Sequence, residues 1–193
     1  MALAIGVVLI PPDALRDFSI SLNELAWKNG KGIRHLNMQE NLPHISLALG
    51  SIDEKDLSAV QDLIGQAARS TGSILVSVDK FKYQREKKES SLCIQNSPEL
   101  QRLHEFLVTG LKPLFIRPVQ EMFLEPVSEH ALSVVERYAD DYAFENYWPH
   151  ITLQCCEAEA ERFPEKQRCK ELAVFHLGSG CTCKKKLLSI ALS

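Results

Sequence analysis

A five-residue sequence that occurs twice constrains the fold of this chain more than any other feature. Residues 43–47 read Pro-His-Ile-Ser-Leu, and residues 149–153 read Pro-His-Ile-Thr-Leu. Side chains alternate between the two faces of a strand, so each histidine shares a face with the hydroxyl residue two positions later. The isoleucine and leucine then point to the opposite face, towards a core, and the proline is tolerated at the first residue of a strand. The repeat therefore predicts two strands that each present an imidazole and a hydroxyl, facing each other around one cleft.

The two motifs resemble those of the 2H phosphoesterase family, which is named after a pair of His-apolar-Ser/Thr-apolar sequences. Here they are His44 to Leu47 and His150 to Leu153, one in each half of the chain. The family has two sheet lobes related by a pseudo-two-fold axis, with helices outside and one motif strand in each lobe. The resemblance implies that residues 1–193 form a single bilobal domain of this kind.

Hydrophobic periodicity separately predicts a mixture of strands and helices, which favours the α+β class with largely antiparallel sheets. The expected N-caps are Asp13, Ser97 and Ser128, and residues 51–54 form a capping-box pattern. Residues 157–167 are predicted as a loop or a short helix. Strands are expected at 3–10, 44–49, 73–81, 91–95, 150–154, 172–177 and 182–190, with another around 122–124, and helices at about 13–28, 54–71, 98–112 and 129–139.

Composition excludes several classes of protein. The chain is 45 % hydrophobic and 24 % charged, which is ordinary for a globular protein. A net charge of −3 supplies no general attraction to long nucleic acid, whereas a small phosphorylated ligand or a nucleic-acid end is compatible with it. The apolar run at 2–10 lacks a basic lead and ends in two prolines, so we expect a buried strand, no signal peptide and no membrane span. The six cysteines form no Cys-x-x-Cys pair, and we expect reduced thiols in a cytoplasmic monomer.

The motif pair suits acid–base chemistry on a phosphodiester. Histidine exchanges a proton near neutral pH, so His44 and His150 can act as one base towards water and one acid towards the leaving oxygen. The hydroxyls of Ser46 and Thr152 can donate to the charged phosphoryl oxygens. This chemistry requires no metal and no cofactor. Analogy with family members makes His44 the acid and His150 the base, although the sequence itself supports either order.

The resemblance also implies a substrate class, namely RNA 3′ ends or nucleotides that carry a 2′,3′-cyclic phosphate. The alternatives are the reverse joining reaction, which makes 2′,5′ links, and a module that binds a nucleotide or RNA end without turnover. Both histidines and both hydroxyls are present, which favours the enzyme over the binding module. Ligase-like members are expected to have a basic residue soon after the second motif, where residues 154–156 here read Gln-Cys-Cys.

Weaker candidates for substrate binding lie outside the motifs. The basic run at 80–88 can contact phosphates, and Tyr83 within it can stack on a base, although a solvated hairpin turn is the preferred interpretation of this run. Tyr147 and Trp148 precede the second motif and suit either a base pocket or a core.

The remaining polar groups have simpler explanations. Lys184 and Lys186 share a face of the last predicted strand, which lies either in solvent or in the cleft, and solvent is the favoured alternative. Cys181 and Cys183 can meet His176 around zinc, but the sequence contains no second close-spaced ligand pair. Ordinary surface or core positions explain the histidines outside the motifs, which are His35, His104, His130 and His176.

Overall fold

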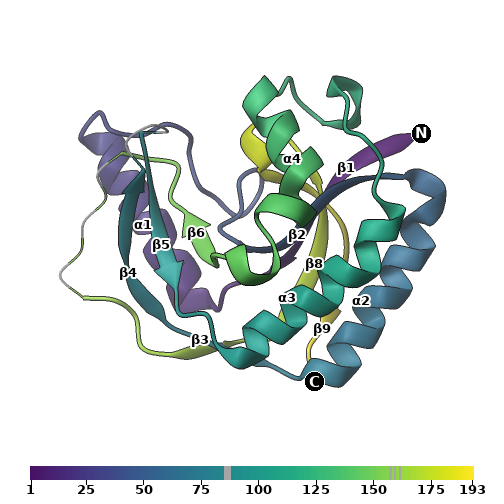
Figure 1. The fold of residues 1–193 in the computed structure, drawn as a ribbon. Coiled ribbons are helices and arrows are strands. Elements are labelled where there is room, and N and C mark those ends of the chain that lie inside the picture. Colours follow the sequence, from purple (N-terminus) through teal and green to yellow (C-terminus); the bar gives the residue numbers. More distant parts are fainter. Residues whose placement is uncertain (85–87, 157, 159, 161) are drawn as a thin grey trace.

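The strands of the computed structural model pair antiparallel throughout the described residues, which are 1–84, 88–156, 158, 160 and 162–193. They are β1 (Ala2–Leu9), β2 (Ile45–Asp53), β3 (Ile74–Val76), β4 (Val78–Gln84), β5 (Glu89–Ile94), β6 (His150–Thr152), β7 (Gln167–Cys169), β8 (Glu171–Leu177) and β9 (Cys183–Ala191). One sheet has the order β2-β1-β8-β9, another has the order β4-β5-β6, and β3 pairs with β7 (Figure 1). Each motif therefore belongs to a different sheet.

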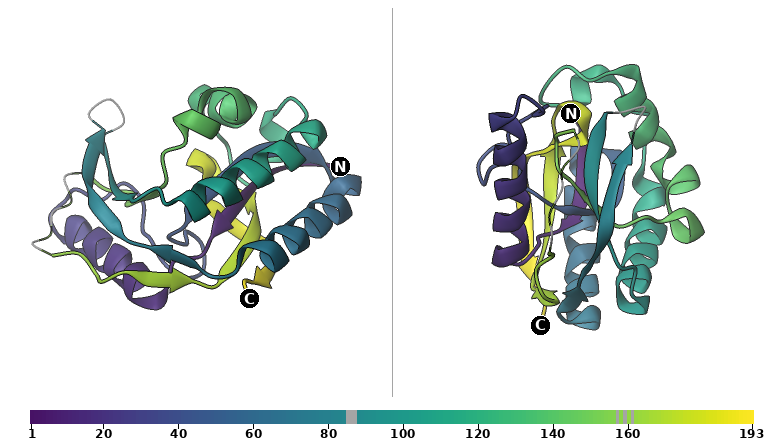
Figure 2. Two further views of the ribbon diagram at one scale, coloured as in Figure 1. Left: turned by 60° about the horizontal axis from the view of Figure 1, so that its bottom comes forward. Right: turned by 90° about the vertical axis from the view of Figure 1, so that its left-hand side faces the viewer.

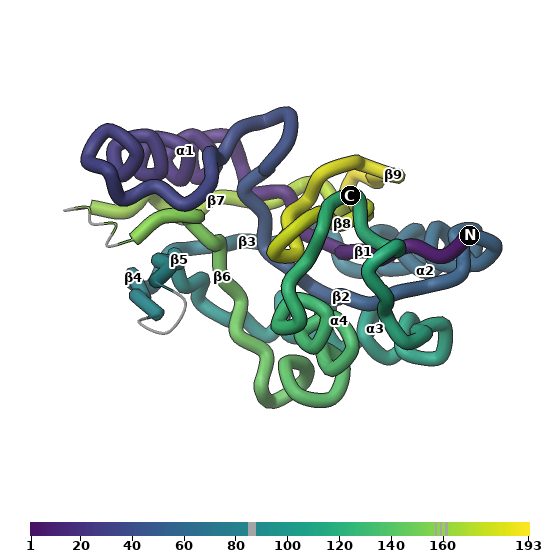
Figure 3. Tube along the Cα trace, turned by 90° about the horizontal axis from the view of Figure 1, so that it is seen from above, coloured from purple at the N-terminus to yellow at the C-terminus, as the bar shows by residue number. Residues whose placement is uncertain are grey.

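The helices are α1 (Asp13–Lys28), α2 (Leu57–Thr71), α3 (Pro98–Leu111) and α4 (Glu129–Asp141). Helices α3 and α4 contact β2, and α2 contacts β9, so all three accompany the four-stranded sheet. Figure 3 shows α1 at the other end of the molecule, near β4 to β7. In the right-hand view of Figure 2, α1 lies on one side of the strands and α3 and α4 lie on the other. This arrangement confirms the expected α+β class with helices outside antiparallel sheets. No helix within the described ranges is long and apolar enough to cross a membrane.

The main buried cluster includes residues from both sheets. Ile5 and Leu47 belong to the four-stranded sheet, Leu92 and Ile151 belong to the three-stranded sheet, and Leu103 comes from α3. All five side chains are at most 1 % exposed. Burial of apolar surface on this scale is the main favourable contribution to folding, and here it also holds the two motif-bearing sheets against each other.

Two of the expected helix caps are confirmed and two are wrong. The hydroxyl oxygens of Ser97 and Ser128 each accept a hydrogen bond of 3.2 Å from the backbone N–H three residues later. Asp13 is already the first residue of α1, and its carboxylate binds Arg16. The capping-box prediction at 51–54 is wrong because β2 pairs with β1 as far as Asp53 and α2 begins only at Leu57.

The strand expected at 73–81 is divided in two. Residues 74–76 pair with β7 and residues 78–84 pair with β5, so the two segments follow different partners. Ser77 lies between them, and its carbonyl accepts a 2.9 Å hydrogen bond from the backbone N–H of Gln95. Strand β7 begins at residue 167, the last residue of the segment 157–167. It was not predicted, because a strand of three residues gives no usable alternation. Residues 157, 159 and 161 of that segment lie outside the described residues.

The strand expected around 122–124 is not formed. Residues 120–122 make a single turn of 3₁₀ helix instead. One backbone hydrogen bond of 2.9 Å, from the N–H of Leu124 to the carbonyl of Leu177, attaches this segment to the end of β8. Prolines at 118 and 126 flank the segment, and proline cannot donate to a ladder, which explains why pairing stops at one bond.

Asn23 connects α1 to two distant parts of the chain. Its side chain is fully buried. The amide nitrogen donates to the carbonyl oxygens of Arg34 and Leu153, each at 2.8 Å, and the amide oxygen accepts from the N–H of Leu36 at 2.9 Å. Leu153 is the last residue of the second motif, so this amide fixes both the α1–β2 connection and the end of β6.

We predict that Asn23→Leu lowers the free energy of unfolding by about 2–4 kcal/mol, because it leaves three buried backbone groups without their partner. Urea unfolding followed by circular dichroism measures this value. Glu24→Leu changes an exposed neighbour on the same helix and should alter the free energy by less than about 0.5 kcal/mol. Equal unfolding midpoints for the two variants would contradict the prediction.

Candidate active site

The first motif enters the four-stranded sheet as the beginning of β2. Ile45 and Ser46 are paired with Leu9 and Val8 of β1. The side chains of Ile45 and Leu47 are fully buried, whereas His44 and Ser46 are half-buried. The alternation predicted from the sequence is therefore present, since the aliphatic pair packs in the core and the polar pair does not.

The second motif repeats this arrangement on β6, the edge strand of the three-stranded sheet. His150 and Thr152 are directly opposite Cys93 and Ser91 of β5. Ile151 is fully buried, and His150 and Thr152 are half-buried. Among the described residues, neither the Thr152 hydroxyl nor that of Ser46 has a hydrogen-bond partner. Both hydroxyls are thus available to donate to a ligand.

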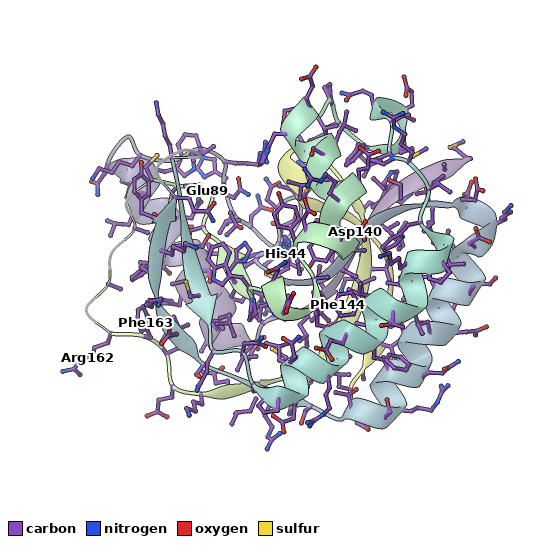
Figure 4. All side chains as sticks on the ribbon, in the orientation of Figure 1. His44, Glu89, Asp140, Phe144, Arg162 and Phe163 are labelled. Atoms are coloured by element: carbon purple, nitrogen blue, oxygen red, sulfur yellow. The ribbon has the colours of Figure 1, made fainter. Side chains whose placement is uncertain are left out.

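The fold brings the two motif strands together. Strands β2 and β6 are in contact, and Figure 3 shows their traces next to each other. The hydroxyl of Tyr147, three residues before His150, donates to the carbonyl oxygen of Ser46 at 3.0 Å. In the view of Figure 4, His44 lies between the three-stranded sheet and α4. Tyr147 itself is buried, and its hydrogen bond ties the approach to the second motif directly to the first.

The two motif histidines have the same backbone support. In each case Nδ1 is 2.8 Å from the carbonyl oxygen two residues earlier, which is that of Leu42 for His44 and that of Trp148 for His150. A carbonyl oxygen only accepts hydrogen bonds, so Nδ1 carries the hydrogen in both rings. Nε2 is then the nitrogen that takes up or releases a proton. This support fixes the orientation of each ring and selects the atom that can do chemistry.

The surroundings of His44 favour its neutral form. Burial lowers the pKa of His44 below its usual value of 6.5, against the opposing effect of the hydrogen bond to Leu42. A partly buried imidazole is harder to charge because the imidazolium loses part of its hydration. A neutral imidazole is what a general base requires at neutral pH. The environment therefore favours His44 as the base, whereas family analogy assigned it the acid role.

Trp148 lies against the second histidine. Its indole stacks on the ring of His150 with centroids 4.0 Å apart and planes 16° apart. The Nζ atom of Lys82, on β4, lies 4.0 Å from the centroid of the same indole. The structure thus places Trp148, one of the three aromatic residues considered for substrate binding, in direct contact with the motif.

Tyr83, another of these aromatic candidates, is separated from the motif by the strand register. Lys82 is opposite Ser91, which is in turn opposite Thr152, and residues directly opposite in neighbouring strands share a face. Tyr83 therefore points to the other face, together with Phe81. The sequence interpretation gave the basic run as a whole a possible role in phosphate contact and named Tyr83 for stacking, but it did not single out Lys82. Only the register of the β4–β5 hairpin, which the sequence did not fix, distinguishes the two.

The lysines of the last strand have acidic partners. Lys184 is only 16 % exposed, and its Nζ lies 2.9 Å from a carboxylate oxygen of Glu125. This lysine lowers the pKa of Glu125 to about 2, with help from hydrogen bonds from Ser179. Lys186 is more exposed and lies 2.8 Å from Glu171. The expectation that this face is in solvent is wrong for Lys184, because a loop carrying Glu125 covers it.

The candidate zinc ligands are not gathered into a site within the described ranges, where no group of three or more histidine, cysteine or acidic side chains has metal-binding geometry. His176 has a different contact, since its Nε2 lies 2.8 Å from the carbonyl oxygen of Met122. Cys183 is buried, and burial raises its pKa well above the ordinary value, which keeps the thiol protonated.

Proteins similar to this chain are found by comparison of structures and not by comparison of sequences. No family model and no curated protein matches the sequence. The chain is similar to the crystal structure of E. coli LigT complexed with 3′-AMP, at 16 % identity and a TM-score of 0.62, over 100 % of this chain and 98 % of LigT. It is also similar to TT0787 of Thermus thermophilus, at 16 % identity and a TM-score of 0.61, over 98 % of each chain. A third structure, described as a phosphoesterase, matches at 16 % identity with a TM-score of 0.57, over 99 % of both chains.

The similar regions cover nearly the whole chain. At 16 % identity, they give information about the fold alone. The chain has the fold of the LigT-type phosphoesterases, which is the 2H phosphoesterase fold that its two motifs implied.

Proposed function

We propose that this protein is a 2H phosphoesterase that hydrolyses 2′,3′-cyclic phosphates of nucleotides or RNA 3′ ends without a metal, using His44 and His150 as its acid–base pair. The observation that carries the proposal is the matched pair of histidines. Each ring is held through Nδ1 by the carbonyl two residues earlier, and each precedes a half-buried hydroxyl on the same face of its strand. The similarity to LigT, which was crystallised with 3′-AMP, supports a nucleotide substrate. We treat residues 1–193 as one bilobal domain that contributes one motif from each lobe.

The proposed reaction divides proton transfer between the histidines. His44, whose pKa is lowered by burial, takes a proton from the attacking water. The water oxygen bonds to phosphorus, the bond from phosphorus to one ribose oxygen breaks, and His150 gives its proton to that departing oxygen. The indole of Trp148 stacks on the ring of His150 and holds its plane in place beside the proposed site. The product is a ribose phosphate monoester.

The hydroxyls and the neighbouring lysine complete the proposed site. Ser46 and Thr152 donate to the non-bridging phosphoryl oxygens, where negative charge increases in the transition state. Trp148 and Lys82 contact the nucleotide beside the reacting phosphate, since both lie on the Thr152 side of the three-stranded sheet. Tyr83 is left out of the proposed site because it points to the opposite face of that sheet.

The test of this function is turnover of cyclic substrates in excess chelator. The purified protein is incubated with the four 2′,3′-cyclic mononucleotides and with oligonucleotides ending in a cyclic phosphate, and products are separated by chromatography. Ring-opened monophosphate should form in EDTA. Saturable binding without product would indicate the binding module instead, and joined oligonucleotides would indicate the 2′,5′ RNA ligase. Activity that disappears in EDTA and returns only with added zinc or magnesium would contradict the proposed mechanism.

Replacement of either histidine should abolish most of the rate. His44→Ala and His150→Ala are each expected to lower kcat by roughly 10²-fold or more, since general catalysis of this kind contributes about 10²–10⁴-fold. The control is His130→Ala, which changes an exposed histidine of α4 and should leave kcat unchanged. Circular dichroism checks that all three variants are folded. Near-normal turnover in either motif variant would remove that histidine from the mechanism.

The pH dependence of the rate should be bell-shaped. Activity should fall at low pH as His44 becomes protonated, with the midpoint below 6.5 because burial lowers its pKa. It should fall again at higher pH as His150 loses its proton. Steady-state kinetics across pH 4.5–9 measures both limbs. A low-pH midpoint above 6.5 would contradict the base role of His44.

The hydroxyl of Thr152 can be tested separately from its shape. Thr152→Val keeps the branched shape and loses the donor, and it should cost roughly 2–4 kcal/mol of transition-state stabilisation, seen mainly in kcat. Ser46→Ala should behave in the same way. Thr152→Ser keeps the donor and should retain most of the rate, which makes it the matched control. If the valine and serine variants were equally active, the hydroxyl would not bind the phosphoryl group.

A further inference from the structure

His104, on α3, has no solvent exposure, yet both of its ring nitrogens are hydrogen-bonded. Nδ1 is 2.6 Å from the carbonyl oxygen of Leu47, and Nε2 accepts a hydrogen bond of 2.9 Å from the backbone N–H of Phe144. The Leu47 oxygen can only accept, and the Phe144 N–H can only donate. The ring must therefore be neutral, with its hydrogen on Nδ1.

These two bonds join the backbones that carry the two motifs. Leu47 is the last residue of the first motif. Phe144 begins the 3₁₀ turn Phe144–Asn146, which leads through Tyr147 into the second motif. One imidazole thus links chain segments that are 57 residues before it and 40 residues after it.

A second interaction reinforces the same connection. The ring of Tyr147 stacks on that of His104, with centroids 3.7 Å apart and planes 3° apart. The hydroxyl of Tyr147 then donates to the carbonyl oxygen of Ser46 at 3.0 Å. The stacked pair therefore contacts two successive carbonyls of the first motif, and it includes Tyr147, which leads into the second motif.

The turn at Phe144 needs such support. Phe144 has a φ of 56°, in the left-handed region that residues other than glycine rarely adopt. A conformation of this kind costs about 1–3 kcal/mol and persists only where surrounding contacts impose it. The hydrogen bond from the Phe144 N–H to His104 is a contact of that type. Loss of the bond would allow the turn, and the strand that follows it, to move.

We propose that His104 is a positioning residue that sets the distance and orientation between the His44 and His150 motifs. This inference rests on the proposed function, because it concerns the geometry of the same acid–base pair. Movement of about 1 Å between reacting groups can cost on the order of 10²-fold in rate. The residues proposed to bind the nucleotide, Trp148 and Lys82, both belong to the second lobe, so substrate binding should depend much less on His104.

The neutral ring that these bonds require is the form present at neutral pH. Burial lowers the pKa of His104, and this effect exceeds the opposing influence of the Leu47 carbonyl and the Glu105 carboxylate. The other rings that face it are those of Tyr138, Phe144 and Tyr147, and all are uncharged at this pH.

Three substitutions of His104 test its ring stacking and its two hydrogen bonds separately. His104→Phe keeps an aromatic ring against Tyr147 and removes both hydrogen bonds. His104→Asn places an amide nitrogen where Nδ1 was and can still donate to Leu47. His104→Gln places an amide oxygen near the former Nε2 and can still accept from Phe144. Each amide variant preserves one of the two links.

The control is a histidine with a similar structural role away from the motifs. His176 is half-buried on β8, and its Nε2 lies 2.8 Å from the carbonyl oxygen of Met122. His176→Phe removes a histidine–backbone hydrogen bond without changing the connection between β2 and β6. It shows how far loss of such a bond alone affects the rate.

Kinetics with a 2′,3′-cyclic nucleotide is the first measurement, at a temperature where thermal melting shows every variant folded. His104→Phe should lower kcat by about 30–100-fold and change KM by less than about 3-fold, with the Asn and Gln variants between it and the wild type. His176→Phe should keep a near-normal kcat. Normal kcat in folded His104→Phe, or equal losses in the two phenylalanine variants, would overturn the inference. If His104→Phe does not fold, the Asn and Gln variants decide in the same way.

Ring signals in ¹H–¹³C NMR spectra separate this inference from the proposed function. The His44 and His150 signals should both move in the His104 variants and remain in place in His176→Phe, whether or not the protein turns over a cyclic phosphate. The wild-type protein could prove to turn over no cyclic phosphate while the His44 and His150 signals still move in the His104 variants. That result would support the positioning role and refute the proposed function. Unmoved signals in every His104 variant would refute the positioning role.

Discussion

Burial of the aliphatic residues in the two motifs fixes the direction of the polar residues beside them. Ile45, Leu47, Ile151 and Leu153 have no exposed surface, and each alternates with a histidine or a hydroxyl residue. A strand cannot shift by one residue without exposing these side chains and burying the polar ones, so the register is strongly specified. The chemistry of the site therefore depends on ordinary hydrophobic packing on the other face of the same strands.

Hydrophobic packing does not by itself fix the position of β2 relative to β6. Buried polar groups fix it. Asn23 ties the end of β6 to α1 and to the α1–β2 connection. His104 and Tyr147 tie the first motif to the turn before the second. Satisfied buried hydrogen bonds are directional, and each becomes costly when one partner is removed. They can fix a relative position where the hydrophobic contacts of the core, which are not directional, would allow several.

The site combines equal backbone support with unequal surroundings. Both motif histidines use Nδ1 in the same way, yet burial lowers the pKa of His44 while an indole stacks on His150. Unequal surroundings can increase the share of molecules in which one imidazole is neutral and the other carries a proton, which is the state that the proposed reaction uses. The difference comes from the elements around each motif, and the motifs themselves are nearly identical.

The local features could be predicted from the sequence: four helices close to their expected positions, the caps at Ser97 and Ser128, the alternation in both motifs and the resemblance to a known fold. These depend on residues a few positions apart, whose spacing is visible in the chain. Tertiary structure alone decided which residue of the β4–β5 hairpin faces Thr152, where the strand at 73–81 divides, and what His104 contacts. Those outcomes depend on partners that are tens of residues away. Periodicity indicates that a face will be buried, but only the folded chain determines what lies against it.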